Sequence, residues 1–142
     1  MPRATTENLG FLLAKASQRW NELLYERFSA RGFGEVRPAY GSILLPLFEE
    51  DELRMGELAR RAGLSKQTMT TMVRLLERAG LVSRERDARD RRAFRIGLTE
   101  RAREFRPVAE AVLAELDELV REALTPRGST ALERALKGVI AL

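Results

Sequence analysis

The sequence predicts a mainly α-helical chain with one small β-hairpin, an α+β fold. Over most of the 142 residues, apolar side chains recur at steps of three and four, which is the spacing of one helical face. Residues 81–98 depart from this spacing, with two short strand-like runs around a polar turn, as in a hairpin. With 44% hydrophobic and 32% charged residues, the composition is that of a folded protein. We expect a single domain over residues 1–142.

The first part of the chain should form two helices. The first covers residues 6–30, has an apolar face from Leu9 to Phe28, and ends at the two glycines of residues 31–34. The second begins at Pro38, because proline suits the first turn of a helix, and runs to about Glu49. Residues 49–52 then form an acidic connection.

Two further helices are expected after the hairpin. Thr99 is placed to cap a long helix whose apolar face includes Phe105, Val112 and Leu116. Pro107 predicts a kink in this helix, and Thr125 with the following proline predicts the start of a last helix.

Residues 55–74 have the pattern of two short helices joined by a tight glycine turn. We expect helices over residues 56–62 and 65–79, with Gly63 in the turn and the hydroxyl of Ser65 capping the second helix. Leu58 and Met69 would face each other, and Ala59 is small where the helices cross. These offsets favour a helix-turn-helix, and the alternative is an ordinary helical hairpin.

The outward face of the second short helix carries side chains that suit the major groove of DNA. There, glutamine can pair with adenine, lysine with guanine, and the threonine methyl group can contact thymine. The candidate DNA-binding residues of this helix are Ser65, Lys66, Gln67, Thr68, Thr70, Thr71 and Arg74.

The hairpin that follows is rich in arginine. Strands are expected over residues 81–86 and 93–98, with the turn at residues 87–91. An arginine at the tip, Arg89, could enter a minor groove, where narrow A·T tracts concentrate negative potential. Asp87 and Asp90 would brace the wing by pairing with neighbouring arginines, and the alternative is that they are solvated charges. The candidate DNA-binding residues of the hairpin are Arg84, Arg86, Arg89, Arg91 and Arg92.

The distribution of charge supports a polyanionic partner. Residues 54–106 hold fifteen basic and seven acidic side chains, whereas the rest of the chain holds ten basic and fourteen acidic ones. A basic middle between acidic flanks fits a central surface that binds nucleic acid.

The chain contains no cysteine and no histidine, so the commonest general bases, metal ligands and redox groups are missing. No glycine motif for phosphate binding is present. We therefore expect no enzyme, no cofactor and no metal site. No apolar run approaches the ~20 residues of a membrane helix, and residues 1–10 lack the pattern of a secretory signal, so we expect a cytoplasmic protein that does not bind membranes.

The motifs together resemble the MarR family of bacterial regulators. The matching segments read G-E-L-A at residues 56–59, G-L-S at 63–65, L-E at 76–77, G-L-V at 80–82, D-A-R-D-R-R at 87–92 and L-T-E at 98–100. The resemblance implies a homodimer associated with the nucleoid when bound to DNA. Residues 38–102 would form the winged helix-turn-helix, and residues 6–37 and 103–142 the dimerisation helices.

The residues support a dimer independently. The apolar faces at residues 9–28 and 132–142 exceed what so small a winged helix needs for its own core, so an interface is expected, with packing within one chain as the alternative. The resemblance further implies release from DNA by a small aromatic or phenolic ligand. Arg19, Trp20 and Tyr40 are the candidates to line its pocket, although aromatic residues at helical spacing are more often core.

The function predicted from these features is a sequence-specific, homodimeric repressor of transcription that binds double-stranded DNA at a palindromic operator. A small ligand could release it. The alternative is a winged-helix module that binds an acidic protein partner without reading DNA sequence. A steep loss of duplex affinity with added salt would favour the first hypothesis.

Overall fold

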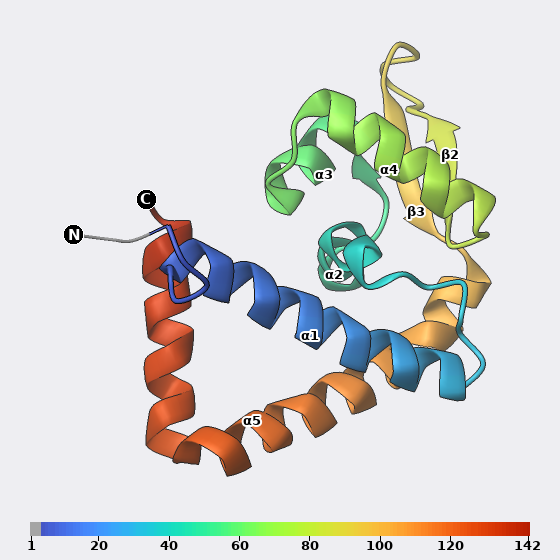
Figure 1. The fold of residues 1–142 in the computed structure, drawn as a ribbon. Coiled ribbons are helices and arrows are strands. Elements are labelled where there is room, and N and C mark those ends of the chain that lie inside the picture. The colour runs from blue at the N-terminus through green and yellow to red at the C-terminus, as the bar shows by residue number, and fades with distance from the viewer. Residues whose placement is uncertain (1–3) are drawn as a thin grey trace.

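The computed structural model describes residues 4–142, and its two parts are visible in Figure 1. A lobe of short helices and a small sheet stands beside two long helices, α1 and α5. In chain order the elements are α1 (Leu9–Ala30), the 3-10 helix η1 (Pro38–Tyr40), α2 (Gly41–Glu49), β1 (Leu53–Arg54), α3 (Met55–Ala62), α4 (Lys66–Arg78), β2 (Val82–Arg86), β3 (Phe94–Leu98) and α5 (Glu100–Ile140). The predicted mainly helical fold with a β-hairpin wing is confirmed.

The first two helices begin later than the sequence predicted. Helix α1 starts at Leu9, because the side chain of Asn8 accepts a hydrogen bond from the Gly10 amide at 2.9 Å and so caps the helix. Pro38 does open a helical segment, but its first turn is 3-10 and the α-helix begins only at Gly41.

The sheet has three antiparallel strands in the order β1-β3-β2, one more than predicted. The additional strand, β1, follows the acidic connection and pairs Leu53 with Ile96 and Arg54 with Arg95. A strand of two residues is too short to show alternation, so sequence periodicity could not reveal it.

The helix-turn-helix forms as its apolar pattern predicted. Leu58 of α3 and Met69 of α4 are fully buried in one hydrophobic cluster, with Ala59 nearly so. Gly63 ends α3 in the left-handed conformation, with φ 67° and ψ 31°, which explains why glycine stands there. The hydroxyl of Ser65 accepts a hydrogen bond from the Thr68 amide at 3.2 Å and so caps α4.

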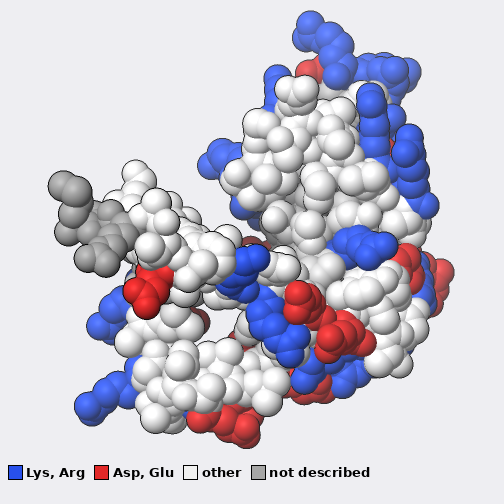
Figure 2. Space-filling model, viewed as in Figure 1, with Lys and Arg blue, Asp and Glu red and all other residues white. Residues whose placement is uncertain are grey.

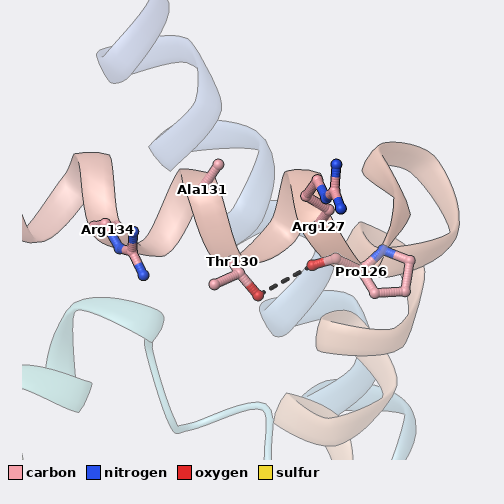
Figure 3. Close-up of a pocket in the computed structure, with 5 residues that line it drawn as sticks. All are labelled: Pro126, Arg127, Thr130, Ala131 and Arg134. Carbon is pink, nitrogen blue, oxygen red and sulfur yellow. Dashed lines mark hydrogen bonds between the residues drawn. The ribbon is translucent and has the colours of Figure 1, made fainter.

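Helix α5 consists of two helical parts separated at Thr125. The Thr99 side chain caps its start, as predicted. The backbone stays helical through Pro107, so the expected kink does not break the helix, whereas Thr125 has the non-helical angles φ 67° and ψ 159°. The predicted last helix therefore exists, and its first turn is closed by a hydrogen bond from the Thr130 hydroxyl to the Pro126 carbonyl at 3.1 Å (Figure 3).

Candidate nucleic-acid interface

Helix α4 presents a polar face to solvent beside the wing. Its buried side is apolar, through Met69, Val73 and Leu76 with the partly buried Met72, so the polar residues of the helix lie on the other side. Thr70 and Thr71 donate their hydroxyl protons to the carbonyls of Lys66 and Gln67, at 2.9 and 3.2 Å. Their methyl groups therefore remain as apolar contacts on this face, next to the exposed side chains of Lys66, Gln67, Thr68 and Arg74.

The wing adds a concentration of positive charge. Figure 2 shows lysine and arginine side chains gathered around the hairpin at the top of the molecule and along the edge beside it. All five predicted wing arginines are exposed: Arg84, Arg86, Arg89, Arg91 and Arg92. Helix α4 and the wing thus form one basic surface on one lobe.

Asp87 anchors the wing turn from beneath. It is only 1% exposed and is the one buried charged residue among the described residues. One carboxylate oxygen accepts hydrogen bonds from the amides of Arg89 and Asp90, at 2.8 and 3.3 Å. The other lies 2.6 Å from Nε of Arg54 and 3.3 Å from Nε of Arg95. The carboxylate thus ties the wing turn to β1 and β3.

The same contacts keep Asp87 ionised. The amide of Arg89, followed by the guanidinium of Arg54, lowers the pKa of Asp87 from 3.8 to about 2, against the opposing effect of burial. The carboxylate is therefore negatively charged at neutral pH, where it pairs with two arginines and accepts hydrogen bonds from two amides.

Asp90, the second predicted brace, makes only local contacts. It accepts hydrogen bonds from the amide and Nε of Arg92, at 3.1 and 3.5 Å, with a side chain that is 41% exposed. Exposed pairs of this kind contribute ~0 to 1 kcal/mol. The geometry therefore separates the two aspartates, since the Asp87 carboxylate ties the wing turn to β1 and β3, whereas the Asp90 side chain contacts only Arg92.

Two residues that the sequence reasoning did not single out belong to this arrangement. Arg54 comes from β1, the strand too short to predict, and it reaches Asp87 only because of the β1–β3 pairing. Phe94 falls in one of the two expected strands, residues 93–98, and its ring lies against the guanidinium groups of Arg84 and Arg86. Arginine at alternate positions opposite an aromatic residue is the signal that could have revealed this contact.

The three predicted pocket residues lie in different surroundings. Trp20 lines a cavity of about 230 Å³ between α1, α2 and α5, whose walls include Phe28, Phe48 and Phe105. Arg19 does not line it and instead pairs with Glu22 on the exposed side of α1. Tyr40 also does not line it and packs against the hydrophobic core, which is the alternative role weighed for such an aromatic residue. Arg37, Ser42 and Asn21 supply the polar part of the wall.

A shallower depression lies where α5 breaks, lined by Pro126, Arg127, Thr130, Ala131 and Arg134. Figure 3 shows that Arg127 and Arg134 point in different directions, so they do not converge on one ligand. Across residues 4–142 no cluster of three carboxylates could hold a metal ion. Within the same range, no helix is both long and apolar enough to cross a membrane.

The fold and the helix-and-wing surface define a winged helix-turn-helix protein. Residues 38–94 match the MarR family model. No curated protein sequence matches the chain significantly.

Similar solved structures extend the likeness to nearly the whole chain. The transcriptional repressor CouR bound to a 23-mer DNA duplex is 26% identical, with a TM-score of 0.80 over 95% of this chain and 94% of that one. The PcaV transcriptional regulator from Streptomyces coelicolor, in complex with its natural ligand, is 20% identical, with a TM-score of 0.81 over 99% and 98%. A MarR transcriptional regulator from Methanosarcina mazei Go1 is 20% identical, with a TM-score of 0.76 over 94% of each chain.

The match of residues 38–94 to the MarR family model agrees with the resemblance drawn from the sequence motifs and confirms it for this part of the chain.

Proposed function

We propose that this chain is a sequence-specific, double-stranded DNA-binding regulator of transcription that acts as a homodimeric repressor on a palindromic operator. The observation that supports this most directly is the pairing of an exposed polar α4 face with an arginine-rich wing held by a buried carboxylate. Helix α4 would enter the major groove. There, Lys66, Gln67, Thr70 and Arg74 would read base edges or position the helix on the DNA backbone. Arg89 at the wing tip would enter the adjoining minor groove.

The likeness to DNA-bound structures supports the same assignment. CouR, which is 26% identical to this chain, is bound to a DNA duplex in its structure, and 94% of the CouR chain aligns with this one. The winged-helix interaction module remains the second candidate. The arginine at the hairpin tip argues against this module, because a protruding arginine suits the narrow minor groove of DNA.

Apolar surface on the helices supports the dimer. Leu9 is 65% exposed on α1, whose buried residues lie near its other end, and Ile140 is 84% exposed on the last part of α5, where residues 130–142 are all exposed. The start of α1 and the last part of α5 enclose an apolar groove of about 580 Å³, lined in part by Leu12, Leu132 and Leu136. Contiguous apolar surface of this size is unfavourable in water, and a two-fold axis would cover it with the same helices of a second copy. On this proposal, residues 6–37 and 103–142 are the dimerisation helices.

The cavity beside Trp20 supports control by a small ligand. Its walls are largely aromatic and aliphatic, with Arg37 as the cationic group, which suits a small aromatic molecule that carries an anionic or phenolic oxygen. A ligand there would bind between α1, α2 and α5 and would release DNA if it favoured a dimer with misplaced α4 helices.

The test is selection of binding sites from a random duplex library by the wild-type chain and by Arg89→Ala in parallel. The expected result is an inverted repeat with half-sites about one helical turn, roughly 10 base pairs, apart. Arg89→Ala should bind it about fivefold to 150-fold more weakly, with a salt slope lower by about one. Arg127→Ala removes the same charge far from the wing and is the matched control, once sedimentation velocity shows that this variant is still a dimer. A folded dimer that enriches no sequence would instead favour the interaction module.

A further inference from the structure

Phe94 is a half-buried aromatic residue that the hydrophobic core does not use. It is the first residue of β3, and its neighbours on the same face, Ile96 and Leu98, are buried in the core cluster. Phe94 belongs neither to that cluster nor to the partly buried apolar residues packed against it. The contacts of its ring lie within the wing instead.

Those contacts are with two arginines. In the sheet, Arg86 stands directly opposite Phe94, and Arg84 stands diagonally, opposite Ile96. The Cζ atom of Arg84 is 4.7 Å from the centre of the Phe94 ring, and that of Arg86 is 5.2 Å from it. Both distances are within the range of cation–π attraction. One ring therefore contacts two guanidinium groups from the opposite strand.

Each arginine has a further contact beyond the ring. Nε of Arg84 lies 3.6 Å from a carboxylate oxygen of Glu77, near the end of α4. Nη1 of Arg86 donates to the carbonyl of Arg91 in the wing turn at 2.6 Å. Contacts thus run without a gap from α4 through Arg84, Phe94 and Arg86 to the wing turn. This side of the wing is distinct from the side on which Asp87 binds Arg54 and Arg95.

We propose that Phe94 is a positioning residue for DNA binding, whose ring holds Arg84 and Arg86 in place between the recognition helix α4 and the wing tip. A free arginine side chain must be immobilised when it meets a phosphate, and pre-ordering one long side chain is worth a factor of about 2 to 12 in affinity. A ring that fixes two guanidinium groups before DNA arrives removes part of that cost. The ring leaves the charge of both groups intact, so they remain available to phosphates.

The proposal rests on the proposed DNA-binding function, and its test separates the two. Wild type, Phe94→Leu and Phe94→Tyr are compared by their affinity for two DNA duplexes. One is the selected operator, and the other is a mixed-sequence duplex of roughly 30 base pairs, which is long enough for two half-sites. Leucine keeps apolar volume and removes the ring, whereas tyrosine keeps the ring. The expected result is an affinity lower by about fivefold for Phe94→Leu and within about twofold of wild type for Phe94→Tyr.

A second background distinguishes positioning from a structural role. In a chain that already carries Arg84→Ala and Arg86→Ala, Phe94→Leu should cause no further loss of affinity, because no guanidinium group remains to be held. A ring needed only for wing structure would still weaken binding in that background and would lower the melting temperature equally in both.

Two results would overturn the proposal. The first is equal affinity of wild type and Phe94→Leu for the duplex. The second is a loss of affinity on Phe94→Leu that persists in the chain without the two arginines. Either result would remove the positioning role and leave the proposed function intact. A wild-type chain that binds neither duplex would end the proposed function itself, and the role of Phe94 in DNA binding with it.

Discussion

Replacing Asp87 by asparagine tests whether wing geometry or simple charge governs DNA binding, because the two make opposite predictions. The change makes each protomer more positive by one unit, and electrostatics alone would then strengthen binding to a polyanion. The structure predicts the reverse. The carboxylate binds two wing amides and two arginines, and an asparagine can replace one acceptor oxygen but not the charge that holds Arg54 and Arg95.

The expected magnitude follows from the groups released. The turn amides can keep one acceptor, while the pairing of the two arginines is weakened, so the wing becomes more mobile and must be ordered when DNA binds. Each long side chain that loses its order costs a factor of about 2 to 12 in affinity. Because the two arginines keep part of their pairing with the asparagine oxygen, we expect affinity for the operator to fall by only about threefold to tenfold in all. The assay is fluorescence anisotropy with a labelled operator over a range of salt concentrations.

Asp90→Asn is the matched control, because it changes the same charge in the same turn but affects only exposed contacts with Arg92. It should alter affinity by less than about twofold. Since the pKa of Asp87 is about 2, its carboxylate is ionised throughout pH 5 to 8, and the defect of Asp87→Asn should not vary over that interval. Tighter binding by Asp87→Asn, or equal losses for both variants, would refute the bracing role.

Three further predictions concern the helices. Leu132→Glu should raise the dimer dissociation constant by a factor of roughly a hundred or more, because two-fold symmetry brings one charge from each protomer into an apolar interface. Sedimentation velocity would show this, and an unchanged dimer would place the interface elsewhere. Ala109→Leu should fill the cavity beside Trp20 and abolish the response of operator binding to single-ring aromatic acids and phenols, with the melting temperature maintained; a retained response would move the ligand site. The Arg101 guanidinium, through its hydrogen bond, lowers the pKa of Glu35 below 4.5, so Glu35 contributes stability above its unfolded-state pKa and loses it as pH falls through the lowered value. The difference in unfolding free energy between wild type and Glu35→Gln should therefore be full at pH 7 and shrink below about pH 4.5, and a constant difference would contradict this linkage.

The helix-turn-helix could be predicted from sequence because its constraints are local. A glycine at residue 63, a capping serine at residue 65 and apolar residues at helical spacing each determine the conformation of their own neighbourhood. The tip arginine and the aspartate two residues before it are also close in sequence. Their shared turn therefore follows from the motif, and the structure adds the hydrogen bonds that fix it.

What the sequence could not predict depends on pairing between distant segments. Arg54 reaches Asp87 across 33 positions, through a strand of two residues that has no periodicity of its own. The cavity beside Trp20 likewise depends on the relative positions of α1, α2 and α5. Arg19 and Tyr40 are next in sequence to residues that line the cavity, yet neither lines it. Asp87 and Asp90 look equivalent in the motif, and only the burial of one of them separates their roles.

The first turns of α5 connect the proposed dimer helices to the DNA-binding lobe at two separate points. Arg101 donates to Glu35 and to the carbonyl of Gly32, and its guanidinium lies 3.8 Å from the ring of Phe33. Arg103 pairs with Asp51, whose carboxylate also accepts the amide of Leu98 at the end of β3. Arg101 thus ties the start of α5 to the segment that follows α1, and Arg103, on another side of the helix, ties α5 to the lobe, so the lobe cannot turn easily about α5. A change in the angle between the two α5 helices of a dimer would therefore carry α4 and the wing with it, and would alter the spacing of the two recognition helices rather than the shape of either lobe.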